Sequence, residues 1–186
     1  MENVDKQNSY GQFLPKNKAY ILAIEQLAYF QDNRDFNNSS PNHAAIVMGN
    51  IFRTAVVDVK MFIGNLDEEV YDNEYYIKYL GLYLKRNLPL TLIFEDFSNK
   101  KSKALELIRE TKNEQIFLYR LKLSTQDFKQ IEHFSIGDGR MYRLEKDTKG
   151  YISTCSFNNK KVVNQYDNEF KYLLSFSELI MDFIKY

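Results

Sequence analysis

His133 is the residue whose type and sequence neighbours best suit chemistry in this chain. Near neutral pH an imidazole can act as a nucleophile or as a proton carrier, provided that a neighbouring group fixes its tautomer. Asp138 follows in a predicted tight turn, and Arg143 and Glu145 follow on the returning strand. Because residues on either side of a hairpin turn become cross-strand neighbours, His133 could face Arg143 or Glu145. A sheet histidine that only hydrogen-bonds to its surroundings is the more ordinary alternative.

The other candidate groups carry weaker signals. His43 follows Pro41 in the first turn of a predicted helix, where a histidine is most often a surface residue. Cys155 lies on a predicted strand and is typical of a small buried side chain rather than a reactive thiol. The acidic run 67–69 follows the first predicted strand, at the end of a strand where the sites of α/β proteins gather. It lacks a metal-binding pattern, so we expect a solvated loop there.

We predict neither a cofactor nor a metal for this chain. The patterns G-x-G-x-x-G and G-x-x-x-x-G-K do not occur, so the sequence has no glycine-rich phosphate loop. The soft or borderline ligands that zinc prefers are limited to Cys155, His43 and His133, which excludes a site built from several cysteines.

The overall composition narrows the class of protein. Lys and Arg number 25, as do Asp and Glu, so the formal net charge is zero and gives no overall attraction to nucleic acid or an anionic membrane. A single cysteine excludes an intramolecular disulfide and suits a reducing compartment. The polar start of the chain lacks the features of a secretory signal, and no apolar stretch approaches the roughly 20 residues of a membrane span. We therefore expect a cytoplasmic protein that does not enter a membrane.

The spacing of apolar residues predicts alternating helices and strands over the first two thirds of the chain. One predicted helix ends near Phe30, a second begins at Ser40-Pro41, a third covers 76–84 and a fourth follows a cap at Ser98. Strands are predicted over 57–63, 88–94 and 115–121. The segment 32–40 between the first two helices suits a polar loop. This order of helices and strands is typical of right-handed βαβ units.

The last third of the chain has a different pattern. Strands over 131–136 and 141–144 flank the turn Gly137-Asp138-Gly139, which carries the Asp-Gly signal of a hairpin. A further strand is predicted over 151–157. Apolar residues at helical spacing from Val163 to Ile184 then predict one long terminal helix.

These elements predict a mixed α/β fold, with a mainly parallel sheet flanked by helices. The fold would occupy residues 43–186, after an N-terminal extension with one helix over residues 1–42. The order of elements resembles one half of the phospholipase D superfamily fold. Residues 51–96 resemble its opening helix–strand–helix–strand unit, and residues 131–157 resemble its motif hairpin, which leads into the small polar segment 156–159.

The chain departs from the catalytic motif of that family, His-x-Lys-x-x-x-x-Asp. With Asp138 in the Asp place, Ile131 takes the His place and His133 takes the Lys place. With His133 in the His place, Ser135 takes the Lys place and Arg140 the Asp place. Neither alignment brings His, Lys and Asp together, so the resemblance implies a degenerate site without the usual phosphodiesterase chemistry.

Three functions follow from these observations. The first is a non-catalytic phospholipase D-like binding or regulatory module of a bacterial-type cytoplasmic protein. The alternative is a divergent phosphodiesterase or nuclease, with His133 as nucleophile or acid, Arg143 as phosphate clamp, and Glu145 or Asp138 as the orienting carboxylate. The third is nucleic-acid binding through lysines, which the zero net charge does not favour. Because the family completes its site from two halves, a single half implies a homodimer or a partner protein.

Overall fold

One mixed sheet forms the centre of the molecule. The structure is a computed structural model that describes residues 18–98, 101–111, 113–122, 131–147 and 151–180. Its sheet has eight strands in the order β1-β7-β6-β5-β2-β3-β4-β8. The strands are β1 (Phe36–Asn38), β2 (Val59–Ile63), β3 (Leu90–Phe94), β4 (Ile116–Leu121), β5 (His133–Gly137), β6 (Met141–Asp147), β7 (Ile152–Ser156) and β8 (Ser177–Leu179).

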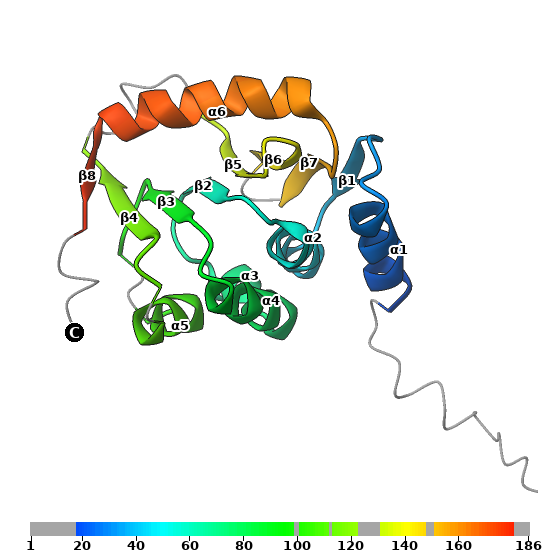
Figure 1. Cartoon of the computed structure of the whole chain (residues 1–186), viewed down its shortest axis with the longest axis horizontal. Coiled ribbons are helices and arrows are strands. Elements are labelled where there is room, and N and C mark those ends of the chain that lie inside the picture. The colour runs from blue at the N-terminus through cyan, green and yellow to red at the C-terminus, as the bar shows by residue number, and fades with distance from the viewer. Residues whose placement is uncertain (1–17, 99–100, 112, 123–130, 148–150, 181–186) are drawn as a thin grey trace, which may run out of the picture.

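Helices cover both faces of this sheet, as the sequence predicts for an α/β fold (Figure 1). The helices are α1 (Lys18–Tyr29), α2 (Pro41–Thr54), α3 (Glu68–Tyr71), α4 (Glu74–Lys85), α5 (Lys103–Glu110) and α6 (Lys160–Ser175). Helices α2 to α5 lie on one face and α6 runs along the other. Helix α2 begins where the sequence predicts, because the Ser40 side chain accepts a hydrogen bond from the His43 backbone N–H.

The two faces of the central strands are both buried. Met61 of β2 and Leu92 of β3 belong to the cluster that packs against α2 and α4. The neighbouring Phe62 and Ile93 belong to a second cluster with Phe170 of α6. Successive side chains of a strand point to opposite faces, so a strand covered on both sides reads as a nearly continuous apolar run. This explains why the sequence identified these strands.

The parallel part of the sheet is smaller than predicted. Strands β2, β3 and β4 are parallel, and their connections run through α3 to α5. Five of the seven described strand pairings are nevertheless antiparallel, so the expectation of a mainly parallel sheet is wrong in its proportion. The hairpin of β5 and β6, the returning β7 and the two edge strands account for this difference.

Both edge strands were missed in the sequence. Strand β1 lies in the segment predicted to be a polar loop, and it pairs with β7 with Phe36 opposite Cys155. Strand β8 follows α6, which ends at Ser175, and pairs antiparallel with β4. The predicted long terminal helix therefore stops early, and Ile184 lies outside the described residues.

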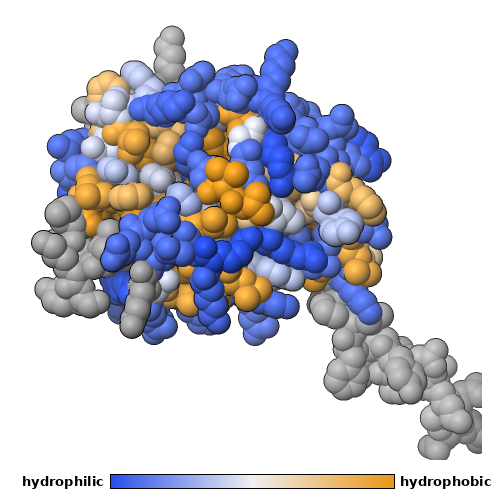
Figure 2. Space-filling model, viewed as in Figure 1, coloured by the Kyte–Doolittle hydropathy of each residue, from blue (hydrophilic) through white to orange (hydrophobic). Residues whose placement is uncertain are grey.

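Two further observations concern helix ends and the surface. Helix α5 is capped by Ser102, whose hydroxyl accepts from the Ala104 backbone N–H, and not by Ser98 as predicted. On the face shown in Figure 2, hydrophobic side chains form small groups bordered by hydrophilic ones. None of the helices in the described part of the chain is long and apolar enough to cross a membrane.

Candidate functional site

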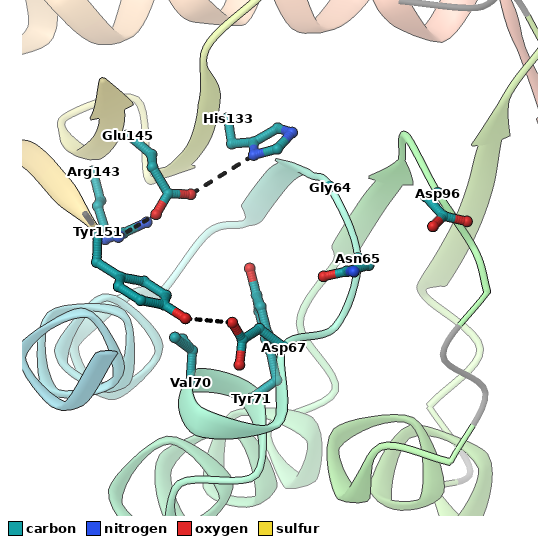
Figure 3. A pocket seen from close by; sticks show the side chains of 10 residues that line it. All are labelled: Gly64, Asn65, Asp67, Val70, Tyr71, Asp96, His133, Arg143, Glu145 and Tyr151. Atoms are coloured by element: carbon teal, nitrogen blue, oxygen red, sulfur yellow. Dashed lines mark hydrogen bonds and ion pairs between the residues drawn. The ribbon is translucent and has the colours of Figure 1, made fainter. Parts of the chain in front are cut away.

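A polar pocket of about 280 Å³ lies at the carboxyl ends of the parallel strands. Gly64 and Asn65 directly follow β2, and Asp96 lies just after β3. Strand β5 runs antiparallel to β2, so its first residue, His133, reaches the same edge of the sheet. Ligand sites of α/β folds gather at this edge. The pocket is lined by Gly64, Asn65, Asp67, Val70, Tyr71, Asp96, His133, Arg143, Glu145 and Tyr151 (Figure 3).

Four charged side chains form a continuous chain, and all of them except Glu95 line the pocket. His133 Nε2 lies 2.7 Å from Glu95 Oε2, and His133 Nδ1 lies 3.7 Å from Glu145 Oε2. Glu145 in turn accepts a hydrogen bond from Arg143 Nη2 at 3.1 Å. His133 and Glu145 are cross-strand partners in the register of β5 and β6, which is one of the two pairings that the sequence left open; Arg143 lies opposite Ser135 instead. Both ring nitrogens of the histidine therefore face carboxylates.

This arrangement fixes the protonation state of the histidine. Burial alone would lower the pKa of His133, but the hydrogen bonds and charges of Glu145 and Glu95 raise it to about 9. Burial would raise the pKa of Glu145, but the hydrogen bonds and charges of His133 and Arg143 hold it below its usual value. At neutral pH the site therefore contains an imidazolium between two carboxylates.

Close packing holds the ring of His133 in place. A Cβ atom at Gly64 would lie 2.7 Å from the Cε1 atom of His133, so only glycine allows the ring this position. The ring also meets Phe62 edge to face, with the centroids 5.4 Å apart. The absence of a side chain at Gly64, directly after β2, therefore allows His133 to reach Glu95.

Arg143 is the second cation of the site. The residue is 4% exposed, and its Nε atom is buried without a hydrogen-bond partner among the described residues. Its ion pair with Glu145 compensates the charge, because a buried guanidinium without a carboxylate would be strongly destabilising. Arg143, which the sequence predicts as a possible phosphate clamp, therefore already pairs with the carboxylate of Glu145.

The opposite side of the pocket comes from the start of α3. Asp67 caps this helix by accepting from the Glu69 backbone N–H, and its other oxygen accepts from the Tyr151 hydroxyl at 2.5 Å. Tyr71, from the same helix, is 7% exposed, and Figure 3 shows its hydroxyl pointing into the space between His133 and Asp67. The acidic run expected to be a solvated loop thus contributes Asp67 to the pocket.

Asp138 lies away from this pocket, at the opposite end of β5. Its carboxylate accepts from the backbone N–H groups of Val56, Val57 and Asp58, at distances of 2.8 to 3.4 Å. The residue has a left-handed backbone with φ of 54°, a conformation that Asp tolerates better than most residues. Of the four candidate residues, the structure brings His133, Arg143 and Glu145 together and gives Asp138 a separate structural contact.

The remaining candidates of the sequence lie elsewhere. His43 stacks on Tyr20, with the ring centroids 3.8 Å apart. Cys155 is fully buried and donates to the side-chain oxygen of Asn38, and burial raises the pKa of its thiol. The described residues include no group of three or more side chains suited to holding a metal ion. Glu95 and Tyr71 were not anticipated; for Glu95 the available signal was its position directly after β3, whereas Tyr71 belongs to the short helix α3.

The fold is phospholipase D-like, because it is similar to solved structures of that kind. Nuc from Salmonella typhimurium, described as a phospholipase D family member, has a TM-score of 0.58 at 13% identity, over 80% of this chain and 98% of Nuc. NucT from Helicobacter pylori has a TM-score of 0.55 at 11% identity, over 79% of this chain and all of NucT. These similarities confirm the fold that the order of elements indicates.

A third similar structure is longer than this chain. TrmBL2, an archaeal chromatin protein whose structure is described as showing a novel mode of DNA binding, has a TM-score of 0.57 at 15% identity. The match covers 89% of this chain and 62% of TrmBL2, so this chain spans less than two thirds of that protein. No family model and no curated protein matches the sequence.

Proposed function

We propose that this protein is a non-catalytic binding module with a phospholipase D-like fold, and that the pocket at the ends of β2 and β3 receives its ligand. The supporting observation is the position of His133 between Glu95 and Glu145. A histidine attacks phosphorus with a ring nitrogen lone pair, and an imidazolium has no such lone pair. With a pKa of about 9, nearly all molecules carry the imidazolium at neutral pH.

Both cations of the site already form ion pairs with carboxylates. Arg143 pairs with Glu145, and His133 pairs with Glu95 and Glu145. Phosphoryl transfer requires positive charge aimed at the phosphate oxygens, and a cation that is already neutralised supplies little of it. The pocket therefore suits binding better than transfer of a phosphoryl group.

The test is hydrolysis by the full chain. We expect no release of nitrophenol from bis(p-nitrophenyl) phosphate, and no cleavage of single-stranded DNA, above the rate in buffer between pH 6 and pH 9. A His133→Gln variant serves as the matched control, because it keeps a polar side chain but removes the imidazole. Hydrolysis by the wild-type chain that is lost in His133→Gln would contradict the proposal.

A divergent phosphodiesterase or nuclease is the second candidate. One observation favours it, since His133, Glu145 and Arg143 do lie along one side of a single pocket. In that case Glu145 would orient the imidazole and Arg143 would contact the phosphate. The same hydrolysis assay decides between the two functions, because this candidate requires turnover. That turnover would rise as His133 loses its proton near pH 9 if the imidazole is the nucleophile, and fall if it is the acid.

Assembly and nucleic-acid binding are separate parts of the proposal. We expect a homodimer, because the described sheet and helices correspond to a single half of the superfamily fold, and light scattering should return twice the mass of one chain. The similarity to TrmBL2 makes DNA a reasonable probe, but the zero net charge does not favour it. A monomeric mass would contradict the dimer and leave the binding module intact.

A further inference from the structure

The pocket carries more negative than positive charge. Each cation of the site is matched, because Glu145 pairs with Arg143 and Glu95 pairs with His133. Two other carboxylates at the pocket, Asp67 and Asp96, have no ion-pair partner among the described residues. Their hydrogen bonds come from neutral donors, which for Asp67 are the Tyr151 hydroxyl and the Glu69 backbone N–H. For Asp96 the described donor is the Ser98 hydroxyl.

The hydroxyl of Tyr71 is a second, independent feature of the pocket. The residue is more than nine-tenths buried, and its ring packs edge to face on Tyr76 at 5.3 Å. No hydrogen-bond partner exists for its hydroxyl among the described residues. Figure 3 shows the oxygen pointing into the pocket, above Asp67 and below His133 and Glu145. The residue is buried except where its hydroxyl meets the pocket, so a ligand that enters the pocket can accept from or donate to this oxygen.

We propose that the pocket binds an alkylammonium or alkylguanidinium group, which Asp67 and Asp96 attract and whose N–H donates to the Tyr71 hydroxyl. The proposal rests on the binding module proposed above and specifies its ligand. The group could belong to a free polyamine-like molecule or to a basic side chain of another protein, and both sources offer the same chemistry.

The charge of the pocket argues against a free anion at the same place. A phosphate ion would face Asp67, Asp96 and Glu145, and like charges in a partly buried space repel more strongly than in water. The cations that could compensate are already paired with carboxylates. The Nε–H of Arg143 needs an acceptor, which a bound water molecule can supply, and it takes no part in this proposal.

Titration calorimetry on the full chain at pH 7 tests the ligand class. The probes are agmatine, an acetylated and amidated arginine peptide, and inorganic phosphate. We expect agmatine to bind and phosphate not to bind, with an affinity that weakens as salt is raised, because salt screens the charges of the site. Binding of the peptide alone would assign the group to a protein side chain, and binding of agmatine would show that a free cation suffices.

Two variants locate the site. Asp67→Asn keeps a side chain that caps α3 well but removes the charge, and Tyr71→Phe removes only the hydroxyl. Each should weaken agmatine binding by about tenfold, the effect of losing one charge-assisted hydrogen bond. Glu178→Gln, which removes a carboxylate at the β8 edge of the sheet, is the matched control and should bind as the wild type does.

The outcomes separate this proposal from the proposed function. Binding of phosphate without agmatine, no binding of any probe, or equal agmatine binding by Asp67→Asn and the wild type would each overturn the cationic ligand. None of these results would restore catalysis. Hydrolysis of bis(p-nitrophenyl) phosphate by the same preparation would instead overturn the non-catalytic function, whatever the cation data show.

Discussion

At the scale of single residues, the contacts of His133 explain its chemistry. A nucleophilic histidine keeps one ring nitrogen free of its proton, and usually one carboxylate or carbonyl orients the other nitrogen. Here carboxylates face both nitrogens, at 2.7 Å for Glu95 and 3.7 Å for Glu145. The second carboxylate favours the protonated ring, in which neither nitrogen has a free lone pair.

The first prediction concerns the dependence of stability on pH. The pKa of His133 is raised to about 9 in the folded state from an ordinary value of 6.5. The stabilisation is therefore fully present below pH 6.5, and it is lost as the pH rises through 9. We expect the free energy of unfolding to fall by roughly 2–3 kcal/mol over this range. Urea unfolding at pH 6.5 and pH 9.5 measures the difference.

The control for this prediction is His133→Gln, which has no titrating group at this position. Its free energy of unfolding should change less between the two pH values than that of the wild type. Direct observation of the ring protons by NMR should give a midpoint near pH 9 for the wild type. A midpoint near 6.5 would show that the two carboxylates do not hold the proton.

The second prediction concerns Gly64. In Gly64→Ala the new methyl group would overlap the ring of His133, so the ring must move away from Glu95. We expect a loss of roughly 1–3 kcal/mol of stability and a lower pKa for His133. Gly81→Ala is the matched control, because its methyl group would meet Leu107 at an ordinary contact distance of 3.4 Å. Equal stability of the two variants would contradict the close packing of the ring.

The sequence predicts only part of these contacts. His133 and Glu145 are near in sequence and share a hairpin, so the strand period of two places them on one face. Glu95 comes from the end of another strand, and no local pattern connects it with His133. Asp138 has the same residue type and neighbourhood as a catalytic carboxylate, and only the tertiary structure shows that it binds backbone N–H groups instead.

At the scale of elements, the hairpin of β5 and β6 connects the two halves of the sheet. Its turn is joined to the chain between α2 and β2 through the carboxylate of Asp138, which accepts three backbone N–H groups. The Asp138 side chain is only 4% exposed, so its carboxylate depends on these donors for its hydrogen bonds. The Asp-Gly turn therefore reverses the chain and also holds the segment between α2 and β2 in place.

The third prediction tests this function. Asp138→Ala would leave three backbone donors without their acceptor and place alanine at a φ of 54°, so we expect a loss of roughly 2–4 kcal/mol of stability. Asp138→Asn keeps one acceptor oxygen and tolerates the left-handed backbone, so it should lose less. Denaturant midpoints measure both changes. Agmatine binding by the Asn variant should stay at the wild-type level, because Asp138 does not line the pocket.

The central strands were predictable and the edge strands were not, for a physical reason. Strands β2 and β3 are buried on both faces, and their composition is apolar except for Lys60 and Thr91. Strand β1 is three residues long, two of them asparagine, and β8 is equally short. Short edge strands depend on the neighbouring strand for their hydrogen bonds, so their own sequence carries little signal.

At the scale of the whole molecule, the N-terminal elements are part of the sheet and its cover. Strand β1 closes one edge of the sheet, and Phe36 stacks on Phe157 at a centroid distance of 5.7 Å. Ile24 and Ala28 of α1 belong to the core cluster that includes α2. Cys155 lies opposite Phe36 in the register and is fully buried. Access to this thiol therefore reports on the attachment of β1.

The fourth prediction uses Cys155 as a probe of that attachment. In the folded chain the thiol should react with Ellman's reagent only when the structure opens, because it is buried. Phe36→Ala should raise the reaction rate roughly tenfold, which corresponds to about 1.4 kcal/mol of lost local stability. Leu179→Ala in the opposite edge strand β8 is the control and should leave the rate unchanged. A rate equal to that of the unfolded chain would contradict the buried position.

Glu95 follows β3, whereas His133 and Glu145 belong to β5 and β6, and this has a consequence for how such a chain can evolve. Replacing one carboxylate would remove one of the two ion-pair partners of the imidazolium, and replacing the imidazole would leave two acids without the cation between them. Substitutions at these positions should therefore occur together in descendants of a common ancestor, through intermediates that are less stable than either end point. An alignment of homologues in which the three positions vary independently would contradict this interdependence.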